Sequence, residues 1–222
     1  MRSISIPSSN TSTFRYRRLF KRVLDVALSS VVLMLILPVF LLIMLLIRFD
    51  SPGPVFFRQM RVGKGGKHFS CLKFRTMRQD ADQSVHQQAV QRFVNGEAVS
   101  DDPKARFKLT TDKRVTRIGA LLRRTSVDEL PQLVNVLRGE MSLVGPRPAI
   151  PYELEYYEEH YHLRYTTEPG MTGLWQVYGR STVGFDEAMK LDLRYVEEWS
   201  FWLDVKLILL TIPAMLMQRG AR

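Results

Sequence analysis

The segment VALSSVVLMLILPVFLLIMLLI, Val26–Ile47, contains no charged residue and decides how this chain can fold. As a helix rising about 1.5 Å per residue, it would be roughly 33 Å long, which is enough to cross the hydrocarbon core of a bilayer. It is too long for the apolar core of a signal peptide, and no small-residue cleavage pattern follows it. We therefore predict a permanent membrane helix over residues 20–49, preceded by a flexible tail over residues 1–19.

Basic residues lie on both sides of this segment, from Arg15 to Arg22 before it and from Arg48 to Arg78 after it. Lys- and Arg-rich flanks are typical of the cytoplasmic side of a membrane. Pro38 lies just past the middle, where a proline removes a helical hydrogen bond and bends the axis. Both facts fit a re-entrant helix that enters and leaves on the cytoplasmic face. A straight span with a translocated basic tail also fits, because prolines are tolerated in spanning helices.

Residues 50–222 predict a compact cytoplasmic domain that is mainly α-helical with a small β element. Two strands are expected within residues 50–77, around a glycine turn at 63–66. A short helix and a loop are expected over 79–103, and a polar, tyrosine-rich helix over 152–165.

The apolar run near the C-terminus, Leu207–Met217, is too short to span a bilayer. With Trp199 and Trp202 before it and arginines after it, the run suits an amphipathic helix in the interfacial plane. An ordinary core helix fits equally well.

The charge balance indicates an anionic partner. Lys and Arg total 32 against 22 Asp and Glu, a formal net charge of +10. Such an excess is typical of proteins that bind nucleic acid, anionic lipid or a phosphorylated substrate. The single cysteine, Cys71, excludes an intrachain disulfide and fits a reducing compartment.

A pair of adjacent acids, Asp128 and Glu129, lies within the stretch LLRRTSVDELPQLVNVL at 121–137. Ser126 to Glu129 matches a capping box, and acids in a first turn complement the helix dipole. Leu130, Leu133, Val134 and Leu137 then repeat on one helical face. From this stretch alone, capping is favoured over chemistry.

Neighbouring basic residues favour chemistry at the same acids. Arg123 and Arg124, with Lys113, Arg114 and Arg117 shortly before them, supply more positive charge than two carboxylates need, as expected of a phosphate site.

Two further features point the same way. Arg147 stands between two prolines, which restrict the backbone and suit bidentate phosphate recognition. The paired acids Asp128 and Glu129 could hold Mg²⁺, which prefers one or two carboxylates plus substrate phosphates. An ionised Asp in such a field can also act as a nucleophile toward phosphorus.

Six segments match one known pattern in order: FKRVLD (20–25), PGPVFFRQMRVGKGG (52–66), KFRTM (73–77), TRIGALLRRTSVDELPQLVNVLRGEMSLVGPRP (116–148), PGMTGLWQVYGR (169–180) and LDLRYVEEWSFWLDVKLILLT (191–211). Together they resemble the bacterial sugar transferase family, in its short form with a catalytic domain only. These are monotopic phosphoglycosyl transferases that start glycan assembly on polyprenyl phosphate.

The resemblance implies transfer of a sugar-1-phosphate, with a hexose expected, from a UDP-sugar to undecaprenyl phosphate, with release of UMP. It implies that Asp128 forms a covalent phosphosugar intermediate and that Glu129 helps to hold Mg²⁺. It further implies that Arg147 and Arg123 bind phosphate or nucleotide, and that Lys73 and Arg75 lie near the same site.

The resemblance also implies a re-entrant membrane helix that breaks at Pro38, although Leu37 stands where the family often has serine. We accordingly expect a bacterial inner-membrane enzyme facing the cytoplasm, in contact with membrane lipids, that primes an exopolysaccharide or another glycan. No nucleic-acid partner is expected, and a homodimer is compatible with the sequence. Two alternatives are a membrane-tethered basic protein that binds nucleic acid or anionic lipid, and a glycosyltransferase that works by single displacement.

Overall fold

The fold is described by a computed structural model over residues 11–78, 84–97, 99, 114–179 and 182–216. Within these ranges the chain is mostly helical, with two small two-stranded sheets and one long N-terminal helix. The predicted α-rich fold with a small β element is confirmed.

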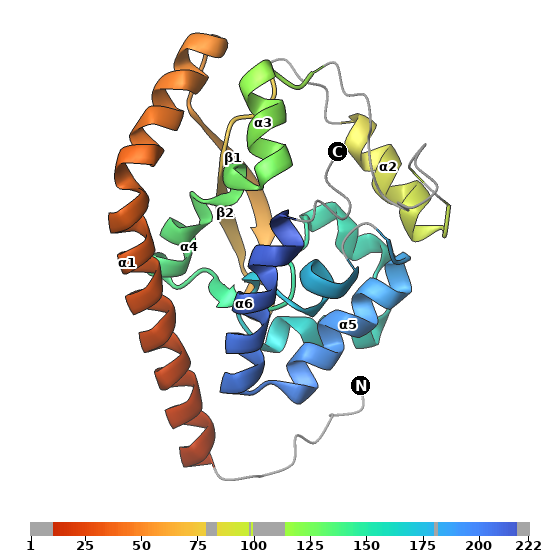
Figure 1. The fold of residues 1–222 in the computed structure, drawn as a ribbon. Coiled ribbons are helices and arrows are strands. Elements are labelled where there is room, and N and C mark those ends of the chain that lie inside the picture. The colour runs from red at the N-terminus through yellow and green to blue at the C-terminus, as the bar shows by residue number, and fades with distance from the viewer. Residues whose placement is uncertain (1–10, 79–83, 98, 100–113, 180–181, 217–222) are drawn as a thin grey trace.

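The N-terminal helix α1, Thr11–Asp50, is one element of 40 residues that runs along an edge of the domain through Pro38 (Figure 1). It begins well before the predicted start at residue 20, because no helix-breaking residue separates Thr11 from the apolar segment. Within the described part of the chain, α1 is the one helix long and apolar enough to cross a membrane. The predicted re-entrant break stays a prediction.

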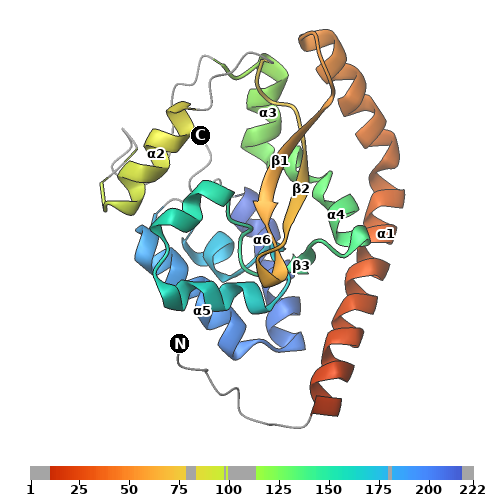
Figure 2. The same ribbon diagram turned by 180° about the vertical axis from the view of Figure 1, so that it is seen from behind.

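The first sheet is the predicted hairpin, formed by β1 (Phe56–Val62) and β2 (His68–Phe74). The strands are antiparallel, with Phe56 opposite Phe74 and Val62 opposite His68. Gly65 and Gly66 form the turn with φ angles of +64° and +75°, which residues with a side chain rarely adopt. Figure 2 shows the hairpin beside α3 and α4.

The remaining elements follow the hairpin in chain order. They are α2 (Ser84–Val94), α3 (Arg117–Thr125), η2 (Val127–Glu129), α4 (Gln132–Arg138), β3 (Ser142–Val144), η3 (Pro151–Tyr156), η4 (Glu159–Thr166), β4 (Gly170–Thr172), η5 (Trp175–Gly179), α5 (Phe185–Glu198) and α6 (Phe201–Leu216). β3 and β4 pair in parallel. The expected tyrosine-rich helix is instead split into the two short 3-10 segments η3 and η4.

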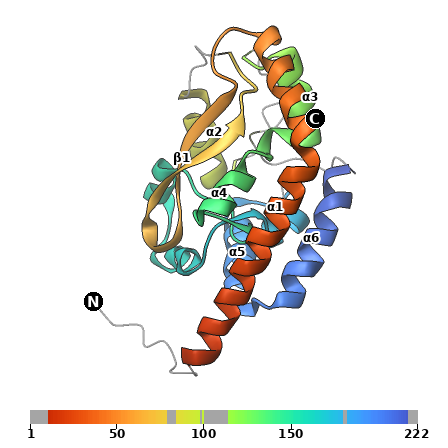
Figure 3. The same ribbon diagram turned by 90° about the vertical axis from the view of Figure 1, so that its left-hand side faces the viewer.

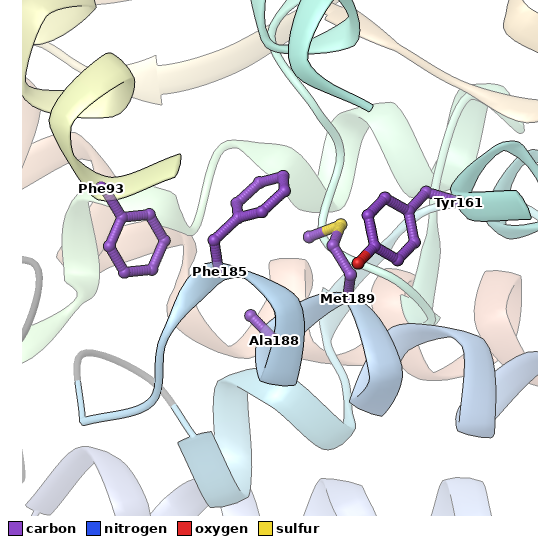
Figure 4. Close-up of a cluster of buried hydrophobic side chains, with 5 residues drawn as sticks. All are labelled: Phe93, Tyr161, Phe185, Ala188 and Met189. Atoms are coloured by element: carbon purple, nitrogen blue, oxygen red, sulfur yellow. The ribbon is translucent and has the colours of Figure 1, made fainter. Parts of the chain in front are cut away.

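Apolar clusters join these elements into one body. One cluster contains Phe93 of α2, Tyr161 of η4, and Phe185, Ala188 and Met189 of α5, and Figure 4 shows these side chains gathered between the three elements. Full burial of a side chain such as Phe or Met stabilises the fold by about 1.5–3 kcal/mol.

Helix α1 contacts the domain at both ends of its apolar segment (Figure 3). Near its start, Lys21 Nζ lies 2.5 Å from Asp204 Oδ2 of α6. Near its end, Ile43 and Ile47 are buried against the hairpin and α3, and Asp50 Oδ2 accepts a hydrogen bond of 3.1 Å from Ile118 N. The helix therefore lies along the domain rather than projecting from it.

Candidate active site

The acidic pair lies in the short turn η2, between α3 and α4. Ser126 ends α3 in a left-handed conformation at φ +56°, where its N–H donates to Arg123 O, and its side chain makes no capping hydrogen bond. The capping-box interpretation is therefore wrong, because Ser126 belongs to the end of one helix and α4 begins only at Gln132. The turn instead presents the acids to a cavity.

This cavity has a volume of about 630 Å³, and both Asp128 and Glu129 line it. A cavity of about 300–1,000 Å³ is typical of a small-molecule site. The basic side chains in its wall come from separate parts of the chain and are Arg61, Lys73, Arg123, Arg147 and Arg164. The fold thus brings the predicted Lys73, Arg123 and Arg147 to the predicted acids.

Glu129 is paired with Lys73, whose Nζ lies 2.6 Å from Glu129 Oε1. Burial raises the pKa of Glu129, but the charge and hydrogen bond of Lys73, with more distant arginines, outweigh this effect and leave the pKa below its ordinary value. Glu129 is therefore ionised at neutral pH.

Asp128 is in a different environment. Burial, and then the neighbouring Glu129 charge, raise the pKa of Asp128 to about 6, although Lys73 and Arg123 oppose the shift. The carboxylate is ionised at neutral pH but held where its charge is poorly compensated. Such a perturbed group in a cavity is a typical candidate for a catalytic role.

Arg147 also lines the cavity and is held by several contacts. Its guanidinium Nη1 lies 3.8 Å from Glu153 Oε1, and its Cζ lies 5.3 Å from the centroid of the Trp175 ring. Its backbone carbonyl accepts a hydrogen bond of 2.5 Å from Arg164 Nη2. Arg164 in turn forms a buried ion pair with Asp192 of α5.

Close backbone packing sets the position of the Arg147 loop. A Cβ on Gly170 of β4 would lie 2.0 Å from Gly145 N, so neither residue of this contact leaves room for a side chain there. A residue larger than glycine at position 170 would push the Arg147 loop away from the cavity.

A similar contact positions Arg123. A Cβ on Gly119 of α3 would lie 2.1 Å from Thr76 O, so α3 packs directly on the chain that leaves the hairpin. Arg123, one turn further along the same helix, donates from Nε to Thr76 Oγ1 at 2.9 Å. The glycine therefore brings this guanidinium to the cavity edge.

Two other predicted substrate-binding residues lie outside the cavity lining. Arg75 donates to Ser51 O at 2.6 Å and to Pro52 O at 2.8 Å, which stabilises the end of α1. The carbonyl of Arg114 accepts from Arg78 N at 2.9 Å, and the residue lies before α3. Neither residue lines the cavity, and the substrate contacts of Arg75 and Arg114 stay predictions. Lys113 lies outside the described residues.

Arg61, Trp175 and the Arg164–Asp192 pair were not predicted as site residues. Arg61 is 4% exposed and donates from Nη1 to Pro148 O at 2.7 Å, beside the Arg147 loop. Its position between two hydrophobic residues of a strand gives no signal of this contact. Arg61, Trp175 and Asp192 lie within the matched sequence motifs, but the motifs alone do not indicate that these residues belong to the site.

The two acids alone supply only some of the ligands that a magnesium ion needs. The described residues hold no group of three or more His, Cys, Asp or Glu that could form a metal site. Asp128 and Glu129 nevertheless form a like-charged pair whose repulsion a cation would relieve. Two carboxylates completed by substrate phosphate oxygens match the preference of Mg²⁺.

Together, a helix apolar and long enough to cross a membrane and a basic cavity around paired carboxylates are the features expected of an enzyme that acts on phosphorylated compounds at a membrane surface. The sequence profile described as "Bacterial sugar transferase" matches residues 16–218. The chain belongs to this family and is therefore a transferase.

Several curated relatives resemble the chain over most of its length. The Exopolysaccharide production protein ExoY of Rhizobium meliloti (strain 1021) is 44% identical over 203 residues, which cover 90% of this chain and 87% of the relative. The UDP-glucose:undecaprenyl-phosphate glucose-1-phosphate transferase of Caulobacter vibrioides is 42% identical, with 90% and 71% covered. The Galactosyl transferase CpsE of Streptococcus agalactiae is 41% identical, with 98% and 47% covered.

Proposed function

We propose that this protein transfers a hexose-1-phosphate from a UDP-sugar to undecaprenyl phosphate and releases UMP, as a first membrane step of exopolysaccharide or other glycan synthesis. The observation that carries the proposal is the convergence of Lys73, Arg123 and Arg147 on one cavity with Asp128. The name of the Caulobacter relative, which specifies undecaprenyl phosphate and glucose-1-phosphate transfer, supports the substrates.

The proposed reaction has two displacements at one phosphorus atom. An oxygen of the Asp128 carboxylate attacks the sugar-linked phosphorus, the bond to the bridging oxygen breaks, and UMP leaves with the electron pair. The lipid phosphate oxygen then attacks the same phosphorus and releases the carboxylate. No proton transfer is required at either step, so the chain has to bind and neutralise phosphate rather than supply an acid.

The basic residues account for that requirement. Arg147, held by Glu153 and the Trp175 ring, and Arg123, held by Thr76, would bind the diphosphate. Lys73 would keep Glu129 ionised. Asp128 and Glu129 are the residues that would hold Mg²⁺, which when bound offsets the negative charge of the diphosphate.

The decisive experiment measures UMP release from a panel of UDP-sugars, with and without undecaprenyl phosphate, in the presence of Mg²⁺. The panel includes glucose and galactose because relatives are named for both sugars. A stoichiometric release of UMP without acceptor, with a phosphosugar retained on the protein, is the expected result. Single displacement predicts no release without acceptor, and a binding protein predicts none at all.

The raised pKa of Asp128 gives the reaction a defined pH dependence. The nucleophile must be deprotonated, so kcat/KM for the UDP-sugar should rise with pH through about 6, the pKa of Asp128, and level off above it. Steady-state rates measured in a series of buffers that covers this pH range check the prediction. A rate that falls as the pH increases through this region would contradict the role of the ionised carboxylate.

We further propose that both ends of α1 lie on the cytoplasmic face of the inner membrane. The two ends of its apolar segment contact one domain, through Lys21 and Asp204 at one end and Ile47 and Asp50 at the other. A straight crossing would place the two contact regions at opposite faces of the membrane, and the domain that joins them, with its charged residues, would have to pass through hydrocarbon. Outward side chains such as Met34 and Leu35, which are 71% and 73% exposed, would face lipid.

This orientation predicts the labelling of two single-cysteine variants. Leu19→Cys and Arg48→Cys should both react with an impermeant maleimide in inverted membrane vesicles and neither in right-side-out vesicles. Cys71 is 1% exposed, so the native protein serves as the blank. Labelling of the two positions from opposite sides would establish a straight span.

A further inference from the structure

The cavity continues beyond the charged site into an apolar region between α1 and α6. Its wall there is formed by Leu28 and Val32 of α1, Met171 of β4, and Ile208, Ile212 and Met215 of α6. The acids and arginines lie in the same continuous cavity. One space therefore connects the proposed phosphate site with two apolar helices.

On each of the two helices, these wall residues lie on a single face. Leu28 and Val32 are four residues apart on one face of α1, and Ile208, Ile212 and Met215 share one face of α6. The helices meet at the Lys21–Asp204 ion pair and at the rings of Phe20 and Phe201, 5.4 Å apart. The wall residues lie about one to three turns further along each helix, so the ion pair closes one end of the apolar region and leaves the other end open.

The apolar region opens on the surface that carries the outward face of α1. Leu28, Val32 and Ile212 are 42%, 37% and 58% exposed although they line the cavity. Hydroxyl groups there are already satisfied, since Thr172 Oγ1 and Thr211 Oγ1 lie 2.6 Å apart and Thr211 also donates to Leu207 O. A nucleoside would find few hydrogen-bonding partners in this region, whereas a hydrocarbon chain needs none.

We propose that the space between α1 and α6 holds the first isoprene units of the acceptor lipid, with its phosphate directed toward Asp128. The proposal rests on the proposed function and adds the residues that select the acceptor. A total volume of about 630 Å³ suits one small ligand, so the cavity would hold the phosphate and the nearest isoprene units, and the rest of the chain would remain in the membrane. An acceptor would thus enter sideways from the lipid while the UDP-sugar enters from water.

A bulky apolar substitution in the wall tests the proposal. Ile212→Trp should reduce kcat/KM for undecaprenyl phosphate about tenfold or more, because added volume excludes the chain. Leu209→Trp is the matched control, since Leu209 is 63% exposed on the same helix and does not line the cavity. UMP release without acceptor is measured on both variants, and that of the control Leu209→Trp should match the wild type in amplitude.

The outcomes separate the two proposals. Absence of acceptor-free UMP release in the wild type would overturn the covalent mechanism of the proposed function. Normal release together with equal acceptor kinetics in Ile212→Trp and Leu209→Trp would overturn the lipid groove alone.

A protection experiment identifies the occupant. Maleimide labelling of Ile212→Cys in detergent should slow on addition of undecaprenyl phosphate and not on addition of phosphatidylglycerol. Equal protection by both lipids would indicate a general lipid surface, and protection that grows with protein concentration would indicate contact between copies. Either result would overturn the proposal.

Discussion

Replacing Asp128 with asparagine is expected to reduce turnover at least about a thousandfold, because an amide is not a nucleophile toward phosphorus. The variant should also keep its fold. Burial raises the pKa of Asp128 from 3.8 to about 6, so the folded protein binds more protons than the unfolded chain between these values. Stability therefore falls as pH rises through this window, and at neutral pH the ionised carboxylate is destabilising. Asparagine removes that charge, so the thermal midpoint should be unchanged or higher.

The measurements are UMP release and thermal unfolding in detergent at the same pH. Glu187→Gln, an acid-to-amide change on the exposed face of α5 and outside the cavity, is the matched control and should keep full activity. Turnover of Asp128→Asn near that of the wild type would rule out the nucleophile. A lowered thermal midpoint would show instead that Asp128 supports the fold.

The second large effect is expected on the stability of the fold, when the buried ion pair between Arg164 and Asp192 is broken. Asp192 and Arg164 are 0% and 3% exposed, and Asp192→Ala leaves the Arg164 charge buried without its partner. Loss of one partner of a buried pair destabilises a protein by about 3–5 kcal/mol. For a chain of this size, the thermal midpoint should fall by about 10 °C. The KM for the UDP-sugar should rise as well, because Arg164 also holds the carbonyl of Arg147.

A double variant makes this prediction sharper. Asp192→Leu combined with Arg164→Met replaces the pair with apolar side chains of similar size, which can be nearly neutral. It should recover most of the stability but not the KM, because methionine cannot donate to the carbonyl of Arg147. Glu198→Ala breaks the exposed Arg194–Glu198 pair of the same helix and should leave the midpoint unchanged. Equal effects of Asp192→Ala and Glu198→Ala would show that burial of the pair contributes little.

Local patterns predicted the elements whose formation depends on neighbours in sequence. The uncharged run Val26–Ile47 predicted α1, and glycines at 65 and 66 predicted the hairpin turn. The same logic failed where two local signals competed. The pattern SVDE predicts that Ser126 starts the next helix, although a left-handed serine ends α3, and nothing in these four residues distinguishes the two outcomes.

The composition of the site could be predicted only in part. The motifs indicated Asp128, Glu129, Lys73, Arg123 and Arg147, and the fold brings all of them to one cavity. Arg75 lies two residues from Lys73 but points to the end of α1, because its partner carbonyls of Ser51 and Pro52 lie there. A motif shows which residues lie near one another in the sequence, but it does not show the direction in which each side chain points.

The sequence by itself determined a long apolar helix, a β-hairpin, paired acids and a surplus of arginine, because charge and periodicity are properties of neighbouring residues. Only the tertiary structure decided that α1 and α6 enclose an apolar extension of the cavity, that Arg164 and Asp192 hold the Arg147 loop, and that Arg75 donates to the end of α1. These depend on contacts between residues far apart in the chain, which form only when the backbone packs closely, as at Gly145 and Gly170. Such contacts cannot be predicted from a local sequence pattern, because their free energy arises from the folded arrangement as a whole.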